Sequence, residues 1–129
     1  MDAAEFREYC LAKNGATEGT PFGDTVLVFK VAGKIFALLS LDAVRARANL
    51  KCDPDLALEL RDRFEQVTPG YHMNKKHWNT VEIESGIPEG EVGKMIDHSY
   101  DLVASAASAR KSGATRLRRY PAAKRPVRH

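Results

Sequence analysis

Two strand-like runs joined by a two-residue turn constrain the fold of this chain more than any other feature. Residues 25–31 and 34–40 are rich in β-branched, aromatic and other apolar side chains, and only Ala32-Gly33 separates them. A connection of two residues that includes glycine is typical of an antiparallel hairpin. The hairpin therefore predicts an antiparallel sheet at the centre of the fold.

The register of this hairpin decides which side chains share a face of the sheet. Counted outward from the turn without interruption, the predicted pairs on one face are Val31–Lys34, Phe29–Phe36 and Leu27–Leu38. The opposite face then carries Val26, Val28, Lys30, Ile35, Ala37 and Leu39. Both faces are largely apolar, which is unusual for a sheet with one side in water. Each face therefore needs a cover, such as a helix, a loop or a partner subunit.

Three amphipathic segments predict helices around this hairpin. The first spans residues 3–13 and places Phe6 and Cys10 on one face. The second begins at the N-cap Asp53, has its buried stripe at Leu56, Leu60, Phe64 and Val67, and is stopped by Pro69-Gly70. The third opens at Pro88 and carries Val92, Ile96, Ser99, Val103 and Ala106 on its stripe.

Two further strands are predicted between the helices. Residues 46–51 alternate, with Ala46, Ala48 and Leu50 facing inward and the polar residues facing outward. A polar loop or hairpin arm over residues 71–78 leads into a strand that ends at residues 81–84. Strands and helices grouped in this order predict an α+β fold with an antiparallel sheet, and place Phe64 and Ile96 in its core.

The charge is distributed unevenly between the body of the chain and its end. Residues 112–129 hold six of the 20 Lys and Arg and none of the 17 Asp and Glu, so residues 1–111 have a net charge of −3 (14 basic against 17 acidic). We interpret residues 1–111 as a single domain and residues 112–129 as a basic, flexible C-terminal tail, of the kind that contacts polyanions or merely solubilises the chain.

Four stretches together resemble the YjbR/MmcQ family of small bacterial proteins. They are PFGDTVLVFKVAGKIFALL (21–39), KCDPDLALELRDRF (51–64), PGYHMNKKHWNTVEI (69–83) and HSYDLV (98–103), and the resemblance covers about residues 5–105. It implies a frataxin-like (CyaY-like) fold, in which helices pack on one face of an antiparallel sheet. It also implies DNA binding through a proposed double-wing arrangement of hairpins, and it identifies no base-contacting or catalytic position.

Basic and aromatic residues in three stretches are the candidate nucleic-acid contacts. The polar arm combines two ammonium groups with a ring that can stack on a base, and the hairpin tip and the strand 46–51 add further cations. Each set alone is also typical of a solvated surface, so a binding patch requires that they share one face. With the tail, the candidates are Lys30, Lys34, Arg47, Lys51, Lys75, Lys76, His77, Trp78, Arg116, Arg118 and Arg119.

No sequence motif indicates an enzyme, a metal site or a cofactor. There is no nucleophile elbow, phosphate-binding glycine loop or HExxH pattern, and His72, His77, His98 and Cys52 have no metal-ligand spacing. We expect Cys10 and Cys52 to be buried thiols of a cytoplasmic protein. No apolar run is long enough to span a membrane.

Two hypotheses of different classes follow. The first is a DNA-binding protein, sequence-independent or weakly specific, that uses the basic hairpin and loop residues and the tail. The second is a protein-interaction or small-ligand module on a frataxin-like scaffold without nucleic-acid affinity, whose partners would include a second copy of the chain or another protein.

Overall fold

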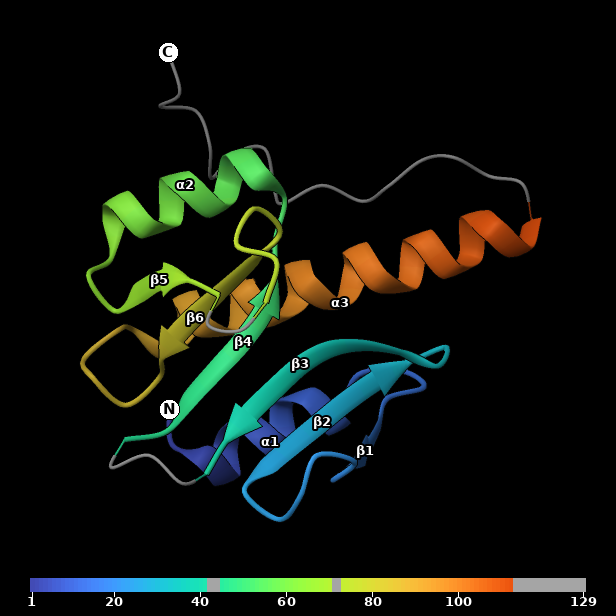
Figure 1. Cartoon of the computed structure of the whole chain (residues 1–129), viewed down its shortest axis with the longest axis horizontal. Coiled ribbons are helices and arrows are strands. Elements are labelled where there is room, and N and C mark those ends of the chain that lie inside the picture. Colours follow the sequence, from blue (N-terminus) through green and yellow to red (C-terminus); the bar gives the residue numbers. More distant parts are fainter. Residues whose placement is uncertain (42–44, 71–72, 113–129) are drawn as a thin grey trace.

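A six-stranded antiparallel sheet and three helices make up the described part of the chain, as a computed structural model shows (Figure 1). The structure describes residues 1–41, 45–70 and 73–112. The helices are α1 (Ala3–Leu11), α2 (Pro54–Arg63) and α3 (Glu89–Ser112). The strands are β1 (Thr17–Gly19), β2 (Val26–Val31), β3 (Lys34–Ser40), β4 (Arg47–Lys51), β5 (Val67–Pro69) and β6 (Trp78–Glu82). The predicted α+β class and antiparallel sheet are confirmed.

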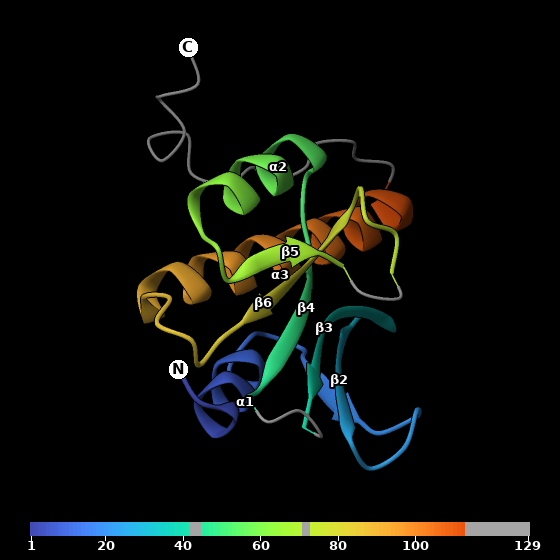
Figure 2. The same cartoon turned by 60° about the vertical axis from the view of Figure 1, so that its left-hand side comes forward.

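The strands lie in the order β1-β2-β3-β4-β6-β5, and every neighbouring pair is antiparallel. In Figure 1, α1 and α3 lie behind the strands, and Figure 2 shows α2 beside β5 at the other end of the sheet from α1. Buried residues of all three helices belong to one hydrophobic cluster, together with Ala48, Leu50 and Val81 of the sheet. The helices therefore pack on a single face, which we call the helix face.

The hairpin register differs from the prediction because of a β-bulge. Val31 pairs with Lys34 as expected, but Phe29 pairs with Ala37 and Leu27 with Leu39. The extra residue lies between these two parts of the ladder, so Phe36 and Ala37 both join the helix-face core. The predicted pairings of Phe29 with Phe36 and of Leu27 with Leu38 are therefore wrong, and Ala37 and Leu39 share the face of Phe29 instead of lying on the opposite one.

The second helix is shorter than predicted. It begins with the expected N-cap, where the Asp53 side chain accepts a hydrogen bond from Leu56 N, but it ends at Arg63. Phe64 takes an extended conformation and is half-buried against the core, and Val67 pairs with Val81 as part of β5. The tertiary pairing with β6 outweighs the continuous apolar spacing that predicted helix up to Pro69.

Aromatic contacts fix α1 and α3 on the helix face. The Tyr9 hydroxyl donates to Asp97 Oδ1 at 2.9 Å, and the Lys13 ammonium lies 5.4 Å and 5.6 Å from the ring centroids of Tyr9 and Tyr100. Cys10 and Cys52 are both buried, as predicted, and neither is in a disulfide. Ile96 is in the core as expected. None of the helices in the described part of the chain has the length and apolarity needed to cross a membrane.

Candidate nucleic-acid interface

The two strands β3 and β4 separate at one end of the sheet, and a cleft opens there. Their pairing stops at Ala37 and Leu50. One residue further along each strand, the buried Ser99 of α3 bridges β3 and β4. Its hydroxyl accepts from Lys51 N at 2.9 Å and donates to Phe36 O at 2.5 Å. Ser99 thus satisfies two backbone groups that would otherwise pair with each other or remain unpaired.

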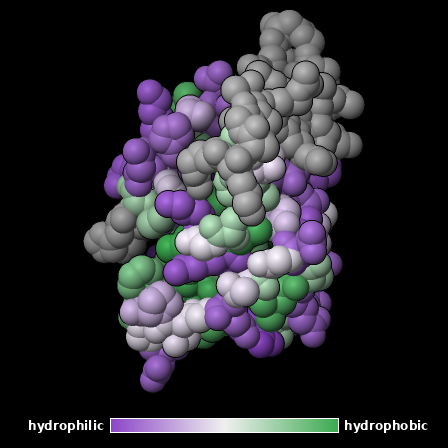
Figure 3. Space-filling model, turned by 90° about the vertical axis from the view of Figure 1, so that its right-hand side faces the viewer, coloured by the Kyte–Doolittle hydropathy of each residue, from purple (hydrophilic) through white to green (hydrophobic). Residues whose placement is uncertain are grey.

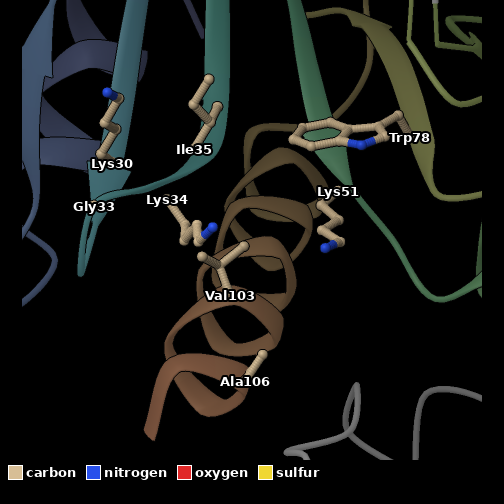
Figure 4. A pocket seen from close by; sticks show the side chains of 8 residues that line it. All are labelled: Lys30, Gly33, Lys34, Ile35, Lys51, Trp78, Val103 and Ala106. Atoms are coloured by element: carbon tan, nitrogen blue, oxygen red, sulfur yellow. The ribbon is translucent and has the colours of Figure 1, made fainter. Parts of the chain in front are cut away.

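The floor of this opening is the far half of α3. A helix of 24 residues is about 36 Å long at 1.5 Å per residue, whereas the seven residues of β3 span roughly 23 Å. The helix therefore extends past the end of the sheet, and Val103 and Ala106 face the gap between the strands (Figure 4).

We call this space the basic cleft. It has a volume of about 470 Å³ and is lined by Lys30, Gly33, Lys34, Ile35, Lys51, Trp78, Val103 and Ala106. In Figure 4 the side chains of Lys34 and Lys51 extend over Val103 from opposite sides, and the indole of Trp78 lies across one end. Figure 3 views this side of the molecule, with hydrophobic surface visible between hydrophilic side chains. Among the described residues, the lining contains three lysines and no acid, so it suits an anion that has an apolar part.

Three consecutive backbone N–H groups hold Lys51 at the edge of the cleft. Lys51 N donates to Ser99 Oγ, Cys52 N donates to His77 O at 2.7 Å, and Asp53 N donates to His98 Nε2 at 3.1 Å. The segment that ends β4 is therefore fixed by α3 on one side and by the loop before β6 on the other. His98 accepts through Nε2, so its ring proton is on Nδ1.

Trp78 is positioned by contacts that leave its ring at the cleft. Its carbonyl accepts from Gly70 N at 2.9 Å and from the Arg61 guanidinium at 3.4 Å. Arg61 also binds Asn79 Oδ1 at 2.7 Å and the carbonyl oxygen of Lys75. A Cβ at position 70 would lie 2.8 Å from the Trp78 Cβ, so the close approach of these two chain segments requires glycine.

The structure brings four of the predicted contact residues together. Lys30, Lys34, Lys51 and Trp78 come from β2, β3, β4 and β6, and all line the basic cleft. Exposed Lys75 and Lys76 and half-buried His77 precede Trp78 in the loop, whose bond to Cys52 N places it beside the end of β4. Arg47 lies at the other end of β4, opposite Glu82, and does not line the cleft.

Some predicted residues lie outside the described part of the chain, and some cleft residues were not predicted. Arg116, Arg118 and Arg119, like His72, fall outside the described residues. The sequence analysis assigned three cleft residues to apolar faces: Ile35, Val103 and Ala106. Only the length of α3, which exceeds that of the strands, could have indicated that Val103 and Ala106 lie beyond the end of the sheet. Within the described residues, no group of three or more His, Cys, Asp or Glu side chains could hold a metal ion.

The comparisons with known proteins identify one family. The family model described as YjbR matches residues 11–102. The uncharacterized protein YjbR of Escherichia coli (strain K12) is 33% identical over 100 residues, covering 78% of this chain and 85% of that protein. The uncharacterized protein YyaQ of Bacillus subtilis (strain 168) is 44% identical over 54 residues, covering 42% of this chain and 45% of its own.

Two solved structures have the same fold over most of their length. The crystal structure of Deinococcus radiodurans protein DR2400, which carries the domain DUF419, has a TM-score of 0.75 at 33% identity, covering 89% of this chain and 83% of that chain. A crystal structure from Pseudomonas syringae has a TM-score of 0.70 at 27% identity, covering 80% of this chain and 99% of that chain.

Proposed function

The chain belongs to the YjbR family, and on that premise we propose that it binds DNA through the basic cleft, without strong sequence preference. The observation that supports this proposal is the convergence of Lys30, Lys34, Lys51 and Trp78, from four strands, on one cleft. Lysine ammonium groups contact phosphates whatever the base sequence, and an aromatic ring stacks on any base.

The local charge supports an anionic ligand although the body of the chain is acidic. Residues 1–111 carry a net −3, yet the part of the cleft lining that the structure describes holds three lysines and no acid. Lys75 and Lys76 extend the positive surface beside Trp78. Such separation of charge directs a polyanion to one part of the surface and away from the rest.

The arrangement of hairpins is consistent with a double-wing mode of binding, which we retain as part of the proposal. The β2–β3 hairpin contributes Lys30 and Lys34 to the cleft, and Lys75 and Lys76 precede Trp78, which lines it from β6. Helices on one face of an antiparallel sheet are also the basis for proposing a frataxin-like scaffold. The tail, with its six cations, would add affinity that does not depend on sequence.

The test is binding of a labelled duplex and a labelled single strand across a salt series. The double variant Lys34→Gln/Lys51→Gln should weaken binding and reduce the slope of log affinity against log salt by about 1 to 2. The variant Arg47→Gln removes a cation from β4, the strand of Lys51, but outside the cleft. It should change the affinity and the salt slope little. A chain ending at residue 111 should lose up to about 5 units of slope if all tail cations are engaged.

Two results would contradict DNA binding at this cleft. One is the absence of measurable binding by the full-length chain at about 50 mM salt, where phosphate contacts are strongest. The other is a Lys34→Gln/Lys51→Gln variant that binds as tightly, and with the same slope, as the unmodified chain.

The size of the cleft favours a small phosphorylated ligand as the second candidate. Its volume of about 470 Å³ is within the range of pockets that bind small molecules. Calorimetry with phosphorylated metabolites and with inorganic phosphate tests this reading. If the protein binds a small phosphorylated compound tightly and does not bind nucleic acid, the second candidate replaces the first. If it binds neither, the cleft is better explained as part of a protein-interaction surface.

A further inference from the structure

A second cleft adjoins the basic cleft across strand β2. We call it the β1 cleft: it has a volume of about 340 Å³ and is lined by Thr17, Glu18, Gly19, Thr20, Pro21, Val28 and Lys30. Lys30 lines both clefts. Val28 and Lys30 point to the same side of β2, opposite the helix-face residue Phe29, so the β1 cleft lies on the sheet face away from the helices and meets the basic cleft at Lys30.

Glu18, the acid among the described residues of the β1 cleft, is already paired. Arg7 donates from Nε to Glu18 Oε1 at 2.8 Å, and this hydrogen bond is the main reason that the pKa of Glu18 is lowered. The remaining lining offers threonine hydroxyls, a proline ring and the shared Lys30. In Figure 4 the Lys30 ammonium points away from Lys34 and Lys51, so it is the cation placed between the two clefts.

Trp78 supplies a flat surface at the cleft, and its backbone is held in place before any ligand arrives. Its backbone is held by Gly70 and Arg61, and its half-buried ring borders the basic cleft. A ring of this kind can stack on an unpaired base, because such a base has an exposed face. In a duplex both faces of each base are stacked on neighbouring pairs, and only edges are accessible in the grooves.

From these features, and resting on the proposed function, we propose that the ligand of this face is single-stranded nucleic acid of at least two nucleotides. One unpaired base stacks on Trp78 above the apolar floor of Val103 and Ala106. The phosphate beside it lies between Lys34 and Lys51. The strand then continues past Lys30 into the β1 cleft, where the next nucleotide lies.

The chain contains a single tryptophan, so its own fluorescence reports on the proposed stacking. Titration of the unmodified full-length protein with thymidine monophosphate, the dinucleotide and an oligothymidylate of about twelve nucleotides should quench Trp78 emission, with affinity rising along this series. A single strand should bind at least about fivefold more tightly than a duplex of equal length, because base–aromatic stacking contributes that much or more.

Variants separate the two clefts. Trp78→Ala should lower affinity for the labelled oligonucleotide at least about fivefold, with Trp78→Phe in between. Lys30→Gln should weaken oligonucleotide binding more than mononucleotide binding, since only the longer ligand continues past Lys30 into the β1 cleft. Arg47→Gln is the matched control and should affect neither. Circular dichroism checks that each variant folds. The fluorescence titration uses the unmodified protein, so its result does not depend on the folding of any variant.

The outcomes distinguish this inference from the proposed function. If duplex binds as tightly as single strand and Trp78 emission is unchanged, while Lys34→Gln/Lys51→Gln still weakens binding, the function stands and the single-strand inference is wrong. A mononucleotide that binds as tightly as the oligonucleotide would also overturn it. If no nucleic acid binds at about 50 mM salt, the proposed function itself fails.

Discussion

At the scale of single residues, glycine at position 70 is what allows Trp78 to reach the cleft. A Cβ on residue 70 would lie 2.8 Å from the Trp78 Cβ and 3.0 Å from its carbonyl oxygen. Contacts this short force the two segments apart. The hydrogen bond from Gly70 N to Trp78 O would then lengthen, and the indole would lose its fixed position.

We therefore expect Gly70→Ala to destabilise the protein by about 1–3 kcal/mol and to shift the emission maximum of Trp78. Gly90→Ala is the matched control, because a Cβ there meets nothing within 4 Å and the residue is helical. It should be neutral or stabilise the protein by up to about 1 kcal/mol. Urea unfolding monitored by fluorescence measures both changes, and equal stability of the two variants would contradict the steric argument.

At the scale of elements, Arg61 ties α2 to the loop and strand that carry the cleft. From the last turns of α2 its guanidinium binds the Lys75 and Trp78 carbonyls and Asn79 Oδ1. A guanidinium can serve three acceptors at once because its donors form a planar fork. This one side chain thus anchors the start of β6 as well as the loop before it.

Replacement of Arg61 by Leu should release this loop. We expect a loss of stability of about 1–3 kcal/mol and faster amide hydrogen exchange around residues 75–79, because the Trp78 carbonyl loses one of its two donors and the Lys75 carbonyl and Asn79 Oδ1 lose theirs from Arg61. Arg63→Leu on the same helix is the control, since Arg63 forms an ion pair at 3.7 Å with Glu91 and lies 4.9 Å from the centroid of the Phe64 ring instead of binding the loop. Unchanged exchange in the Arg61 variant would show that Gly70 and β5 suffice to hold the loop.

The elements also show how far sequence patterns reach. Alternation and turn residues predicted β2, β3, β4 and the N-cap of α2 correctly, because these depend on neighbours in the chain. The bulge at Phe36 and the three-residue strands β1 and β5 were not predicted. They depend on pairing with distant residues, such as Val67 with Val81, which a short local window does not contain.

At the scale of the whole molecule, the contact between α1 and α3 affects stability at high pH. Burial, followed by the hydrogen bond to Asp97, raises the pKa of Tyr9 from 10.0 to about 12, and burial raises that of Cys10 from 9.0 to about 12. Both groups ionise more easily in the unfolded chain than in the folded one. The stability they contribute is complete well below pH 9, the ordinary pKa of the Cys10 thiol, and is lost as the pH rises towards 12.

We expect the free energy of unfolding to fall by on the order of 1 kcal/mol between about pH 8 and pH 10 from these two groups. Urea unfolding at several pH values measures this slope. The double variant Tyr9→Phe/Cys10→Ala should show a flatter pH dependence in the same range. A slope that is identical with and without the two groups would mean that they do not control alkaline unfolding.

The candidate site, unlike the fold, could be predicted only in part from the sequence. Lys30, Lys34, Lys51 and Trp78 were recognised by residue type, but their convergence depends on the separation of β3 from β4 and on the length of α3. Arg47 has the same alternation as Lys51, yet four residues along a strand placed it at the opposite end of the sheet. Residue type indicated the chemistry, and the topology decided which residues meet.

The short outer strands have a consequence for the behaviour of the protein in concentrated solution. Both edges of the sheet are three residues long, Thr17–Gly19 and Val67–Pro69, and the second ends in a residue that has no N–H to donate. A long, flat edge is a template onto which another chain can add a strand, and this is a common first step in aggregation. Edges as short as these offer few unpaired backbone groups, so the sheet resists growth from one molecule into the next.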